Sequence, residues 1–583
     1  MTAEKKNYRL SIVGYALSAM LLGLLSTTSE TSAQSVDFSV ANDFRYGIGK
    51  QFKNEEEERK EYLENLFNGR VNISNNLGNL LLGFRVELDK PREVGLDTTG
   101  LTQYFAEIRK DGLTARGGTF YQLVGTGLVM NTFESRPIGF NTQILGGNID
   151  YKRKEFKAGV YGGTMSYADI VKEGRVEDYV LRGAWGEGSP IDEIKFGASF
   201  LSATGLKKRG VFSNDFDAYL REGYIEGNYE GFTALYNWAD KRSSIDSGTA
   251  ALSSSTNYGT GWYGKFGYTG DLFGVTAEYK DYRFDLVKPK PAIDPNRETR
   301  ALPFQNGPTL VPEHDKTLLA RNPHTIDFSD EVGFQFSGLV VPTDALTLSF
   351  LATAASRHAA YDPVVVTDTF GVESLEYELV GGKRLAFPEL KDGRYSPYWE
   401  VFLQGEYQLN DDISLVLGVQ RKDNVIYYDK LSVEAPATEE FYRTFGGLVE
   451  STITLWQGNS LHAILEAQHV FDSEKDTEGN DSLGIKASDG RYINTLLTLE
   501  FTRSPRWSAN VRVEWSSIDN EQINSEGEDR HIWPVVGGTY RIGRSHTIGA
   551  QYGWERGGIV CTGGVCRFIN PFTGFRLSIA SKL

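Results

Sequence analysis

The segments of this chain that read as β-strands are joined by links that alternate between short and long. Roughly two dozen segments carry apolar residues at every second position, the period of a strand with one buried face. The short links include residues 75–79, 110–112, 270–271, 410–412 and 504–505, and the long ones include residues 49–62, 124–141, 202–216, 287–325 and 472–490. Tight turns at one end and long loops at the other are typical of an outer-membrane β-barrel, with the turns in the periplasm.

Composition is compatible with such a barrel. Hydrophobic residues make up 40% of the 583 residues, and the mean hydropathy of −0.35 would by itself indicate a soluble protein. In a barrel, half of each strand faces water, so the strand signal is weak and must be read over the whole chain. The net charge of −16 and the absence of a basic stripe argue against nucleic acid as a partner.

The alternation also predicts which side chains face lipid. Val511, Val513 and Trp515 alternate with Arg512 and Glu514, so the first set is expected outside and the second in the lumen. A soluble β-sandwich or solenoid is the competing interpretation. The pattern favours an all-β chain: one transmembrane antiparallel barrel of about 24 strands, in a range of roughly 22–26, over residues 34–583. Residues 372–387 could add a hairpin within a long loop.

Residues 1–33 resemble a secretory signal peptide. Lys5, Lys6 and Arg9 precede a mostly apolar stretch over residues 10–25, and small residues at 31–33 offer a cleavage site. A membrane anchor is the alternative, although the apolar run is short for a bilayer span. The expected location is therefore the outer membrane, and the expected partners are its lipid and the machinery that assembles barrels. No separate plug domain is evident between this segment and the first strand.

Residues 288–323 hold seven of the 18 prolines and cannot form a membrane-spanning strand, because proline lacks a backbone donor. Two interpretations remain open: a constriction or lid over the lumen, and an extracellular loop packed on its neighbours. His314 and His324, with Glu313 and Asp327 nearby, match no defined metal site, which favours solvent-facing histidines. The residues expected in a constriction are Pro303, Pro308, Pro312, His314, Arg321 and Pro323.

Charged residues at alternate strand positions are expected to line the lumen. They either set the electric field of a water-filled pore or pair across strands as struts, with most of them expected to be struts. The predicted lining residues are Arg85, Glu87, Glu107, Arg109, Arg116, Glu331, Glu400, Glu406, Glu450, Glu466, Arg512, Glu514, Glu555 and Arg576.

Cys561 and Cys566 are the only cysteines, and their closeness in an oxidising compartment predicts a disulfide in the last long loop. Residues 259–264 spell GxGxxG, but no helix follows, so a dinucleotide site is not expected. No catalytic motif nominates a nucleophile. The chain is therefore not expected to be an enzyme or to hold a cofactor, and the lack of CxxCH means that any haem would come from another chain.

Several stretches resemble a family of outer-membrane barrels from Bacteroidota, Chlorobi and related bacteria that is known only as a domain of unknown function. The matching stretches are residues 116–121, 125–128, 133–136, 145–147, 306–308, His314, 321–323 and 561–566 running on to 571–574. The resemblance spans nearly the whole mature chain. It implies a barrel and a lineage but no substrate.

The function expected from these patterns is a porin-like channel for passive passage of an unidentified solute. The alternative is a structural or assembly barrel that anchors surface loops or partners a secreted or periplasmic protein. Conductance through an open lumen would favour the channel, and a lumen filled by residues 287–325 would favour the alternative.

Overall fold

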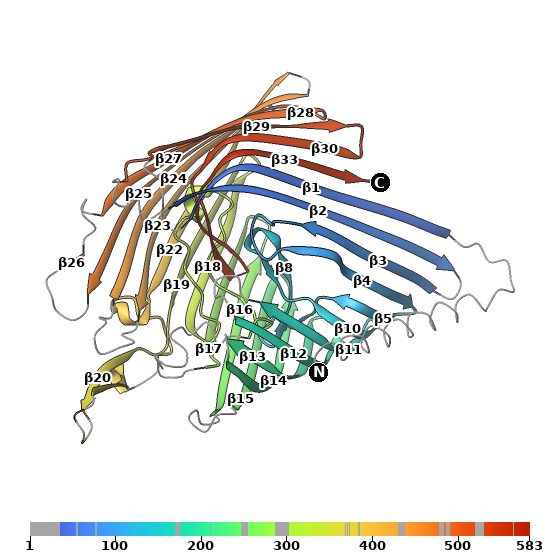
Figure 1. Cartoon of the computed structure of the whole chain (residues 1–583), viewed down its shortest axis with the longest axis vertical. Helices are drawn as coiled ribbons and strands as arrows, with labels where there is room; N and C mark the ends of the chain where they lie inside the picture. The colour runs from blue at the N-terminus through green and yellow to red at the C-terminus, as the bar shows by residue number, and fades with distance from the viewer. Residues whose placement is uncertain are drawn as a thin grey trace.

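The chain folds into a closed antiparallel β-barrel of 24 strands (Figure 1). The barrel closes because the first strand pairs with the last, from Ala41 opposite Lys582 to Gln51 opposite Phe572. The structure is a computed structural model. It describes residues 35–53, 56–75, 78–168, 175–209, 212–246, 255–285, 302–367, 369, 371, 373–382, 385–428, 438–456, 458–476, 483–484, 490–518, 530–563 and 565–583. The predicted signal peptide lies outside these residues.

The strands of the wall follow one another in chain order. They are β1 (Ser35–Lys53), β2 (Glu56–Asn75), β3 (Gly78–Asp89), β4 (Thr98–Lys110), β5 (Leu113–Phe120), β10 (Ile144–Lys152), β11 (Phe156–Ala168), β12 (Arg175–Ile191), β13 (Ile194–Arg209), β14 (Phe212–Tyr229), β15 (Phe232–Asp246), β16 (Ser255–Thr269), β17 (Phe273–Arg283), β18 (Asp330–Thr343), β19 (Leu346–Ser356), β22 (Tyr398–Asn410), β23 (Ile413–Tyr428), β24 (Thr438–Trp456), β25 (Asn459–Asp476), β27 (Arg491–Arg503), β28 (Trp507–Ser516), β29 (Ile532–Ile542), β30 (His546–Glu555) and β33 (Phe572–Lys582).

Short elements lie in the connections between these strands. They are β6 (Leu123–Val124), β7 (Met130–Asn131), β8 (Glu134–Ser135), η1 (Arg136–Ile138), β9 (Phe140–Asn141), α2 (Thr317–Ala320), β20 (Tyr361–Thr367), β21 (Glu373–Leu379), η3 (Val380–Gly382), η4 (Gly393–Tyr395), β26 (Leu483–Gly484), β31 (Gly558–Thr562) and β32 (Val565–Ile569). None of the described helices is long and apolar enough to cross a membrane.

Tight turns at one end of the barrel have the backbone conformation that two-residue hairpin turns require. Asp111 and Gly112, between β4 and β5, both have positive φ, at 48° and 83°. Glu230 and Gly231, between β14 and β15, repeat the pattern at 46° and 85°. Two successive residues of positive φ form the type I′ turn, whose twist matches that of the flanking strands.

At the opposite end, two predicted loops are strands instead. The interpretation of residues 49–62 and 202–216 as long loops is wrong, because β1 and β2 pair out to Lys53 and Glu56, and β13 and β14 pair out to Arg209 and Phe212. These hairpins are tall, and their upper parts carry charges such as the exposed Lys50–Glu57 ion pair. Polar residues on both faces remove the alternation that marks a strand within lipid.

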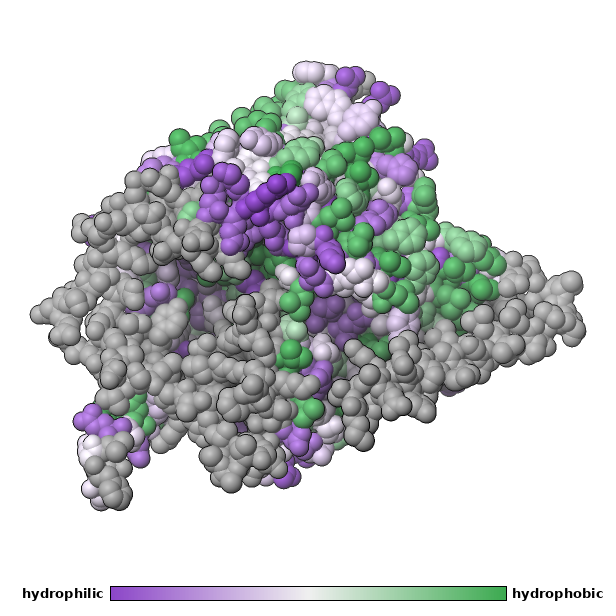
Figure 2. All heavy atoms as spheres, in the orientation of Figure 1, coloured by the Kyte–Doolittle hydropathy of each residue, from purple (hydrophilic) through white to green (hydrophobic). Residues whose placement is uncertain are grey.

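The two faces of the wall differ as the alternation predicts. On β3, Phe84, Val86 and Leu88 are exposed on the outer surface, whereas Glu87 and Asp89 are buried on the inner side. Figure 2 shows hydrophobic residues over much of the wall at the right of the view and hydrophilic residues gathered toward the middle. An apolar outer wall around a polar interior is the arrangement that a barrel needs in order to sit in lipid.

Two substitutions on β28 test directly which of its side chains face lipid and which face the lumen. Val513→Arg should impair assembly, at a cost of about 2–4 kcal/mol if the site lies near the bilayer midplane, whereas Arg512→Ala should be tolerated in a wet lumen. Heat-modifiable migration on gels would report the folded fraction of each variant in isolated outer membranes. Equal tolerance of both changes would contradict the assignment of the faces.

The connection between β19 and β22 lies over the outside of the wall. The phenol of Tyr279 donates to the carbonyl of Ala386 and its ring lies 6.0 Å from that of Phe387. His358 contacts Asp281 at 3.0 Å and Asp330 at 3.3 Å, on the faces of β17 and β18 that point away from the lumen. Burial lowers the pKa of His358, but these carboxylates outweigh burial and raise it. The β20–β21 hairpin of this connection, residues 361–379, projects from the barrel (Figure 1) and overlaps only in part with the hairpin predicted at residues 372–387.

Candidate functional site

Residues 302–329, which we call the second plug loop, lie inside the barrel. Their backbone carbonyls accept hydrogen bonds from inward-facing side chains of two wall strands, β17 and β19. Lys280 of β17 donates to Thr309, the Tyr282 hydroxyl donates to Pro308 at 2.9 Å, and Thr353 of β19 donates to Leu310 at 2.5 Å. Three successive carbonyls of the described part of the proline-rich segment are thus bound by the wall, which fixes the path of the loop there.

The same loop reaches β23 and β25, further along the wall, through the short helix α2. Glu466 of β25 accepts from the backbone N–H of Leu318 at 2.7 Å, and Gln468 donates to the Leu318 carbonyl at 2.7 Å. Lys422 of β23, itself buried, donates to the carbonyls of Leu319 at 3.1 Å and Arg321 at 2.6 Å. These contacts show that the loop runs along the inner face of the wall from β17 to β25.

Ion pairs hold the second plug loop to acidic residues of the wall. Arg321 lies 2.6 Å from Glu514, Lys316 lies 2.7 Å from Glu450, and His314 contacts Glu400. Burial lowers the pKa of Lys316, but the Glu450 carboxylate outweighs burial and raises it, so the ammonium charge is retained. Each of these three carboxylates comes from a different strand, so these contacts fix the loop at several points along the wall from β22 to β28.

Residues 121–143, which we call the first plug loop, pack against the second. The Asn131 backbone N–H donates to the Phe304 carbonyl at 2.8 Å. The Asn131 amide donates to the Asn306 carbonyl at 2.8 Å, and the Asn306 amide returns a bond to the Asn131 carbonyl at 3.0 Å. These reciprocal bonds join two segments far apart in sequence into one plug, and Figure 1 shows β8 of the first loop within the ring of strands.

Gly125 and Gly127 allow the first plug loop to approach its neighbours. Both have positive φ, at 53° and 91°. A Cβ on Gly125 would lie 2.3 Å from the Glu222 carboxylate, and one on Gly127 would lie 2.6 Å from the Asn306 carbonyl oxygen. Glycine is therefore required at both positions, because the conformation disfavours side chains and no space exists for one.

An apolar core fixes the plug to one side of the wall. Leu128, Val129 and Met130 of the first loop and Phe304 of the second are fully buried. The inward-facing apolar residues that complete this core include Tyr161, Met165, Tyr179, Leu181, Leu201, Phe216, Leu220 and Tyr263, from β11 to β16. The plug is thus attached by apolar packing on the β11–β17 side and mainly by polar contacts on the β18–β28 side.

Arg136 is an anchor that the sequence analysis did not single out as a site. It extends from η1 to three carboxylates of β2 and β3, with contacts of 3.2 Å to Glu64, 3.1 Å to Glu87 and 2.9 Å to Asp89. Burial disfavours its charge, but the three carboxylates outweigh burial and raise its pKa. The sequence feature that could have identified Arg136 is its position as the one arginine in the mostly apolar stretch that follows residue 123.

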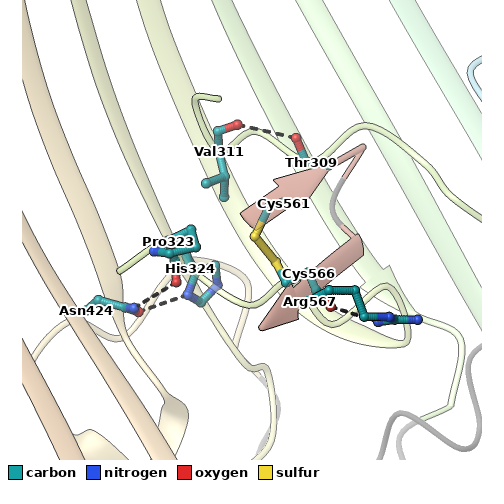
Figure 3. The surroundings of a disulfide bond; sticks show 8 residues. All are labelled: Thr309, Val311, Pro323, His324, Asn424, Cys561, Cys566 and Arg567. Carbon is teal, nitrogen blue, oxygen red and sulfur yellow. Dashed lines mark hydrogen bonds between the residues drawn. A yellow bond between two sulfur atoms is a disulfide. The ribbon is translucent and has the colours of Figure 1, made fainter. Parts of the chain in front are cut away.

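Cys561 and Cys566 form a disulfide, as predicted. They lie on β31 and β32, a hairpin beside the second plug loop, near Thr309 and His324 (Figure 3). Val565 packs against the cluster of Ile138, Phe140 and Tyr167. The last long loop thus forms a hairpin that packs against Ile138 and Phe140 of the first plug loop.

Removing the disulfide should loosen this hairpin without unfolding the barrel. The bridge closes a ring of few residues, so it should contribute about 2 kcal/mol at most. The double variant Cys561→Ser with Cys566→Ser should assemble normally and be cut faster by protease between β30 and β33. Cysteine substitution that prevents the protein from reaching the membrane would contradict this local role.

Many of the predicted lining residues contact the plug. Seven do so through hydrogen bonds or ion pairs: Arg85, Glu87, Glu331, Glu400, Glu450, Glu466 and Glu514. Glu107, Arg109 and Arg116 form a second group on β4 and β5, and Arg512, Glu555 and Arg576 form a third on β28, β30 and β33. Glu406 contacts Gln404 at 2.9 Å, away from these groups. Whether any of them tunes passage stays a prediction.

All six residues predicted for a constriction belong to the second plug loop. The carbonyl of Pro303 accepts from Asn306 at 3.0 Å, and that of Pro323 accepts from Asn424 at 3.2 Å. Pro312 and His314 border a cavity of about 620 Å³, together with Glu313, Phe402 and inward-facing residues such as Ser337. A second cavity, of about 340 Å³, lies against β2–β5. The plug therefore leaves space on its flanks.

His324 does not face solvent, so that expectation is wrong for this residue, whereas His314 is partly buried at the border of the larger cavity. His324 is buried, stacks on Tyr398 with ring centroids 4.7 Å apart, and contacts Asn424 at 3.2 Å. His314 packs edge-on against Phe402 at 4.9 Å. Within the described parts of the chain, no group of three or more potential ligands could hold a metal ion. These histidines serve packing and hydrogen bonding.

A family model matches residues 9–583, almost the entire chain, and is described as a family of unknown function, DUF6029. The chain belongs to the DUF6029 family. No curated protein matches it. Membership agrees with the resemblance to an uncharacterised family, and no observation tests the bacterial lineage that the resemblance implies.

Solved barrels resemble this DUF6029 protein at low identity. The siderophore receptor PirA from Pseudomonas aeruginosa is 9% identical with a TM-score of 0.43, covering 94% of this chain and 80% of that chain. The outer membrane protein OprD from the same organism is 12% identical with a TM-score of 0.31, covering 66% and 87%. The ferric citrate transporter FecA is 9% identical with a TM-score of 0.40, covering 94% and 79%. Similarity at this level assigns no substrate to the DUF6029 protein.

Proposed function

We propose that this protein is an outer-membrane channel through which a small solute passes along the flank of an internal plug. The observation that carries the proposal is the asymmetric attachment of the plug. Apolar packing fixes it against β11–β17, polar contacts hold it along β18–β28, and two cavities border it, one beside β16–β19 and one against β2–β5. Polar side chains beside these cavities provide the surroundings that a hydrated solute needs.

An outer-membrane location is part of this proposal. The closed barrel leaves no unpaired strand edge, and its outer wall is apolar, which together satisfy the requirements for a structure embedded in lipid. Export by a cleaved signal peptide, membrane lipid and barrel-assembly machinery belong to the same proposal. Nothing in the site suggests chemistry on a substrate, so we propose transport and no enzymatic activity.

Conductance measurements in planar lipid bilayers test whether the protein forms a channel. Purified protein should give small, discrete conductance steps, because the plug occupies much of the lumen. A protein that inserts, as shown by protection of its strands from protease, but gives no steps even after replacement of the second plug loop would refute the channel.

A structural or assembly role is the second candidate, and the filled lumen favours it. The plug shares an apolar core with the wall, as a permanently closed barrel would. The β20–β21 hairpin projects outside the barrel at the end opposite the tight turns, where it would contact a secreted or surface protein (Figure 1). This role predicts no conductance, together with a partner that co-purifies with the intact protein and is lost when residues 361–379 are replaced by a short linker.

A further inference from the structure

We infer that the cavity against β2–β5 is a binding subsite for a small oxyanion, either a polycarboxylate or a phosphate-bearing solute. The role of the subsite in passage rests on the proposed channel function, whereas binding itself does not. The cavity measures about 340 Å³, and four arginines line it, one from each of the four strands: Arg70, Arg85, Arg109 and Arg116. A volume near the lower end of the roughly 300–1,000 Å³ range of ligand pockets suits a small solute.

The charges of this pocket do not balance. Glu107 is the one carboxylate that lines it, and Arg109 at 2.5 Å and Arg116 at 3.5 Å share it. Arg85 is neutralised separately by Glu134 at 2.7 Å and Glu87 at 3.6 Å. Three guanidinium groups therefore face a single carboxylate, which leaves a local excess of two positive charges.

Arg70 is the group with the most freedom to bind. Its side chain is exposed on β2, and within the described ranges it forms no ion pair or side-chain hydrogen bond. A guanidinium offers five donors in a planar fork that matches a carboxylate or a phosphate. The chain has a net charge of −16, yet this arginine has no carboxylate partner among the described residues. It is therefore a candidate to bind an anionic ligand.

Neighbouring side chains hold the pocket in shape. The guanidinium carbon of Arg116 lies 3.7 Å from the centroid of the Phe105 ring, and its Nε donates to the Thr119 carbonyl at 3.1 Å. Gln103 and Tyr121 add neutral polar groups, 3.3 Å apart. Because Arg116 is already fixed by a ring and a carbonyl, little conformational entropy remains to be lost when its outward N–H groups bind an anion.

The first plug loop forms one wall of the pocket. Thr119 and Phe120 end β5, Tyr121 and Gln143 are the first and last residues of the loop, and all four line the cavity. An anion seated there would lie between the plug and the wall, on the flank where the proposed passage runs. The other cavity, beside Pro312, is lined by Glu313 and His314 and contains no arginine, so selection for anions is expected at β2–β5.

Calorimetry on detergent-solubilised, full-length protein tests this subsite, with citrate and inorganic phosphate as probes at low salt. Saturable binding of at least one probe should appear, and Arg70→Ala should weaken it about tenfold or more, through loss of a charge-assisted contact. Arg541→Ala, at an exposed arginine of β29 outside the pocket, removes the same charge and should leave binding unchanged. Preference for citrate over phosphate, or the reverse, identifies the class of solute.

The subsite is overturned if neither probe binds the folded wild type, or if Arg70→Ala and Arg541→Ala weaken binding equally. Heat-modifiable migration of each variant verifies that the barrel is folded. The two proposals fail separately. A protein that binds citrate but never conducts retains the subsite and loses the channel, whereas one that conducts without binding retains the channel and loses the subsite.

Discussion

Replacing residues 303–323 with a short Gly/Ser linker should raise the single-channel conductance several-fold while the barrel still assembles. A barrel of 24 strands is wide, and even 22-stranded transporters keep the lumen plugged. In this protein the second plug loop occupies the lumen along the wall from β17 to β25, so its removal should widen the path for ions. The wall should survive, since the strand pairs that close it do not involve the loop.

A matched control distinguishes a wider lumen from a general disturbance of the barrel by the linker. Residues 361–379 form the β20–β21 hairpin outside the lumen, and the same linker placed there should leave conductance unchanged. Equal conductance of wild type and the 303–323 variant, both shown to be folded, would mean that the second plug loop is not the constriction.

Lys280→Met should destabilise the protein by about 3–5 kcal/mol, the usual cost of leaving one member of a buried ion pair without its partner. Lys280 and Glu331 contact each other between β17 and β18, and both side chains are almost completely buried. Lys280 also donates to the Thr309 carbonyl of the second plug loop, so that contact is lost as well. Urea titration of detergent-folded protein, followed by tryptophan fluorescence, would measure the loss.

The double change Lys280→Met with Glu331→Gln should recover much of that stability. Glutamine keeps an acceptor for the backbone N–H of Asp327, which Glu331 now binds at 2.8 Å, and it carries no charge to leave unpaired. Similar stability in the single and double variants would contradict the view that an uncompensated buried carboxylate causes the loss.

The barrel could be predicted from sequence because its physical rule is simple. Because one face of each strand meets lipid and the other meets water, apolar and polar residues alternate along the strand. Val513, next to Glu514, is an example. The same rule explains the errors at residues 49–62 and 202–216. Once a hairpin rises above the bilayer, both faces meet water, and the pairing of Lys50 with Glu57 leaves no alternation to read.

The interior was harder to predict. Proline content showed that residues 288–323 could not be a strand, and the carboxylates that meet Arg321 and Lys316 were among the predicted lining residues. The first plug loop gave no comparable signal. Its place depends on reciprocal bonds between Asn131 and Asn306, whose separation in sequence no local pattern reveals. The inward turn of the cysteine hairpin likewise depends on long-range packing.

The central claim, that two connections of the barrel fill its lumen, is tested most directly by an engineered disulfide between the plug and the wall. The Thr126 hydroxyl of the first plug loop lies 2.7 Å from the Asn237 amide on the inner face of β15. Thr126→Cys with Asn237→Cys, in a background lacking Cys561 and Cys566, should give a cross-linked peptide in the mass spectrum of the oxidised protein. Thr126→Cys with Trp238→Cys, at the outward-facing neighbour, should give none. Free thiols in the first pair, or an equal cross-link in both, would contradict the account.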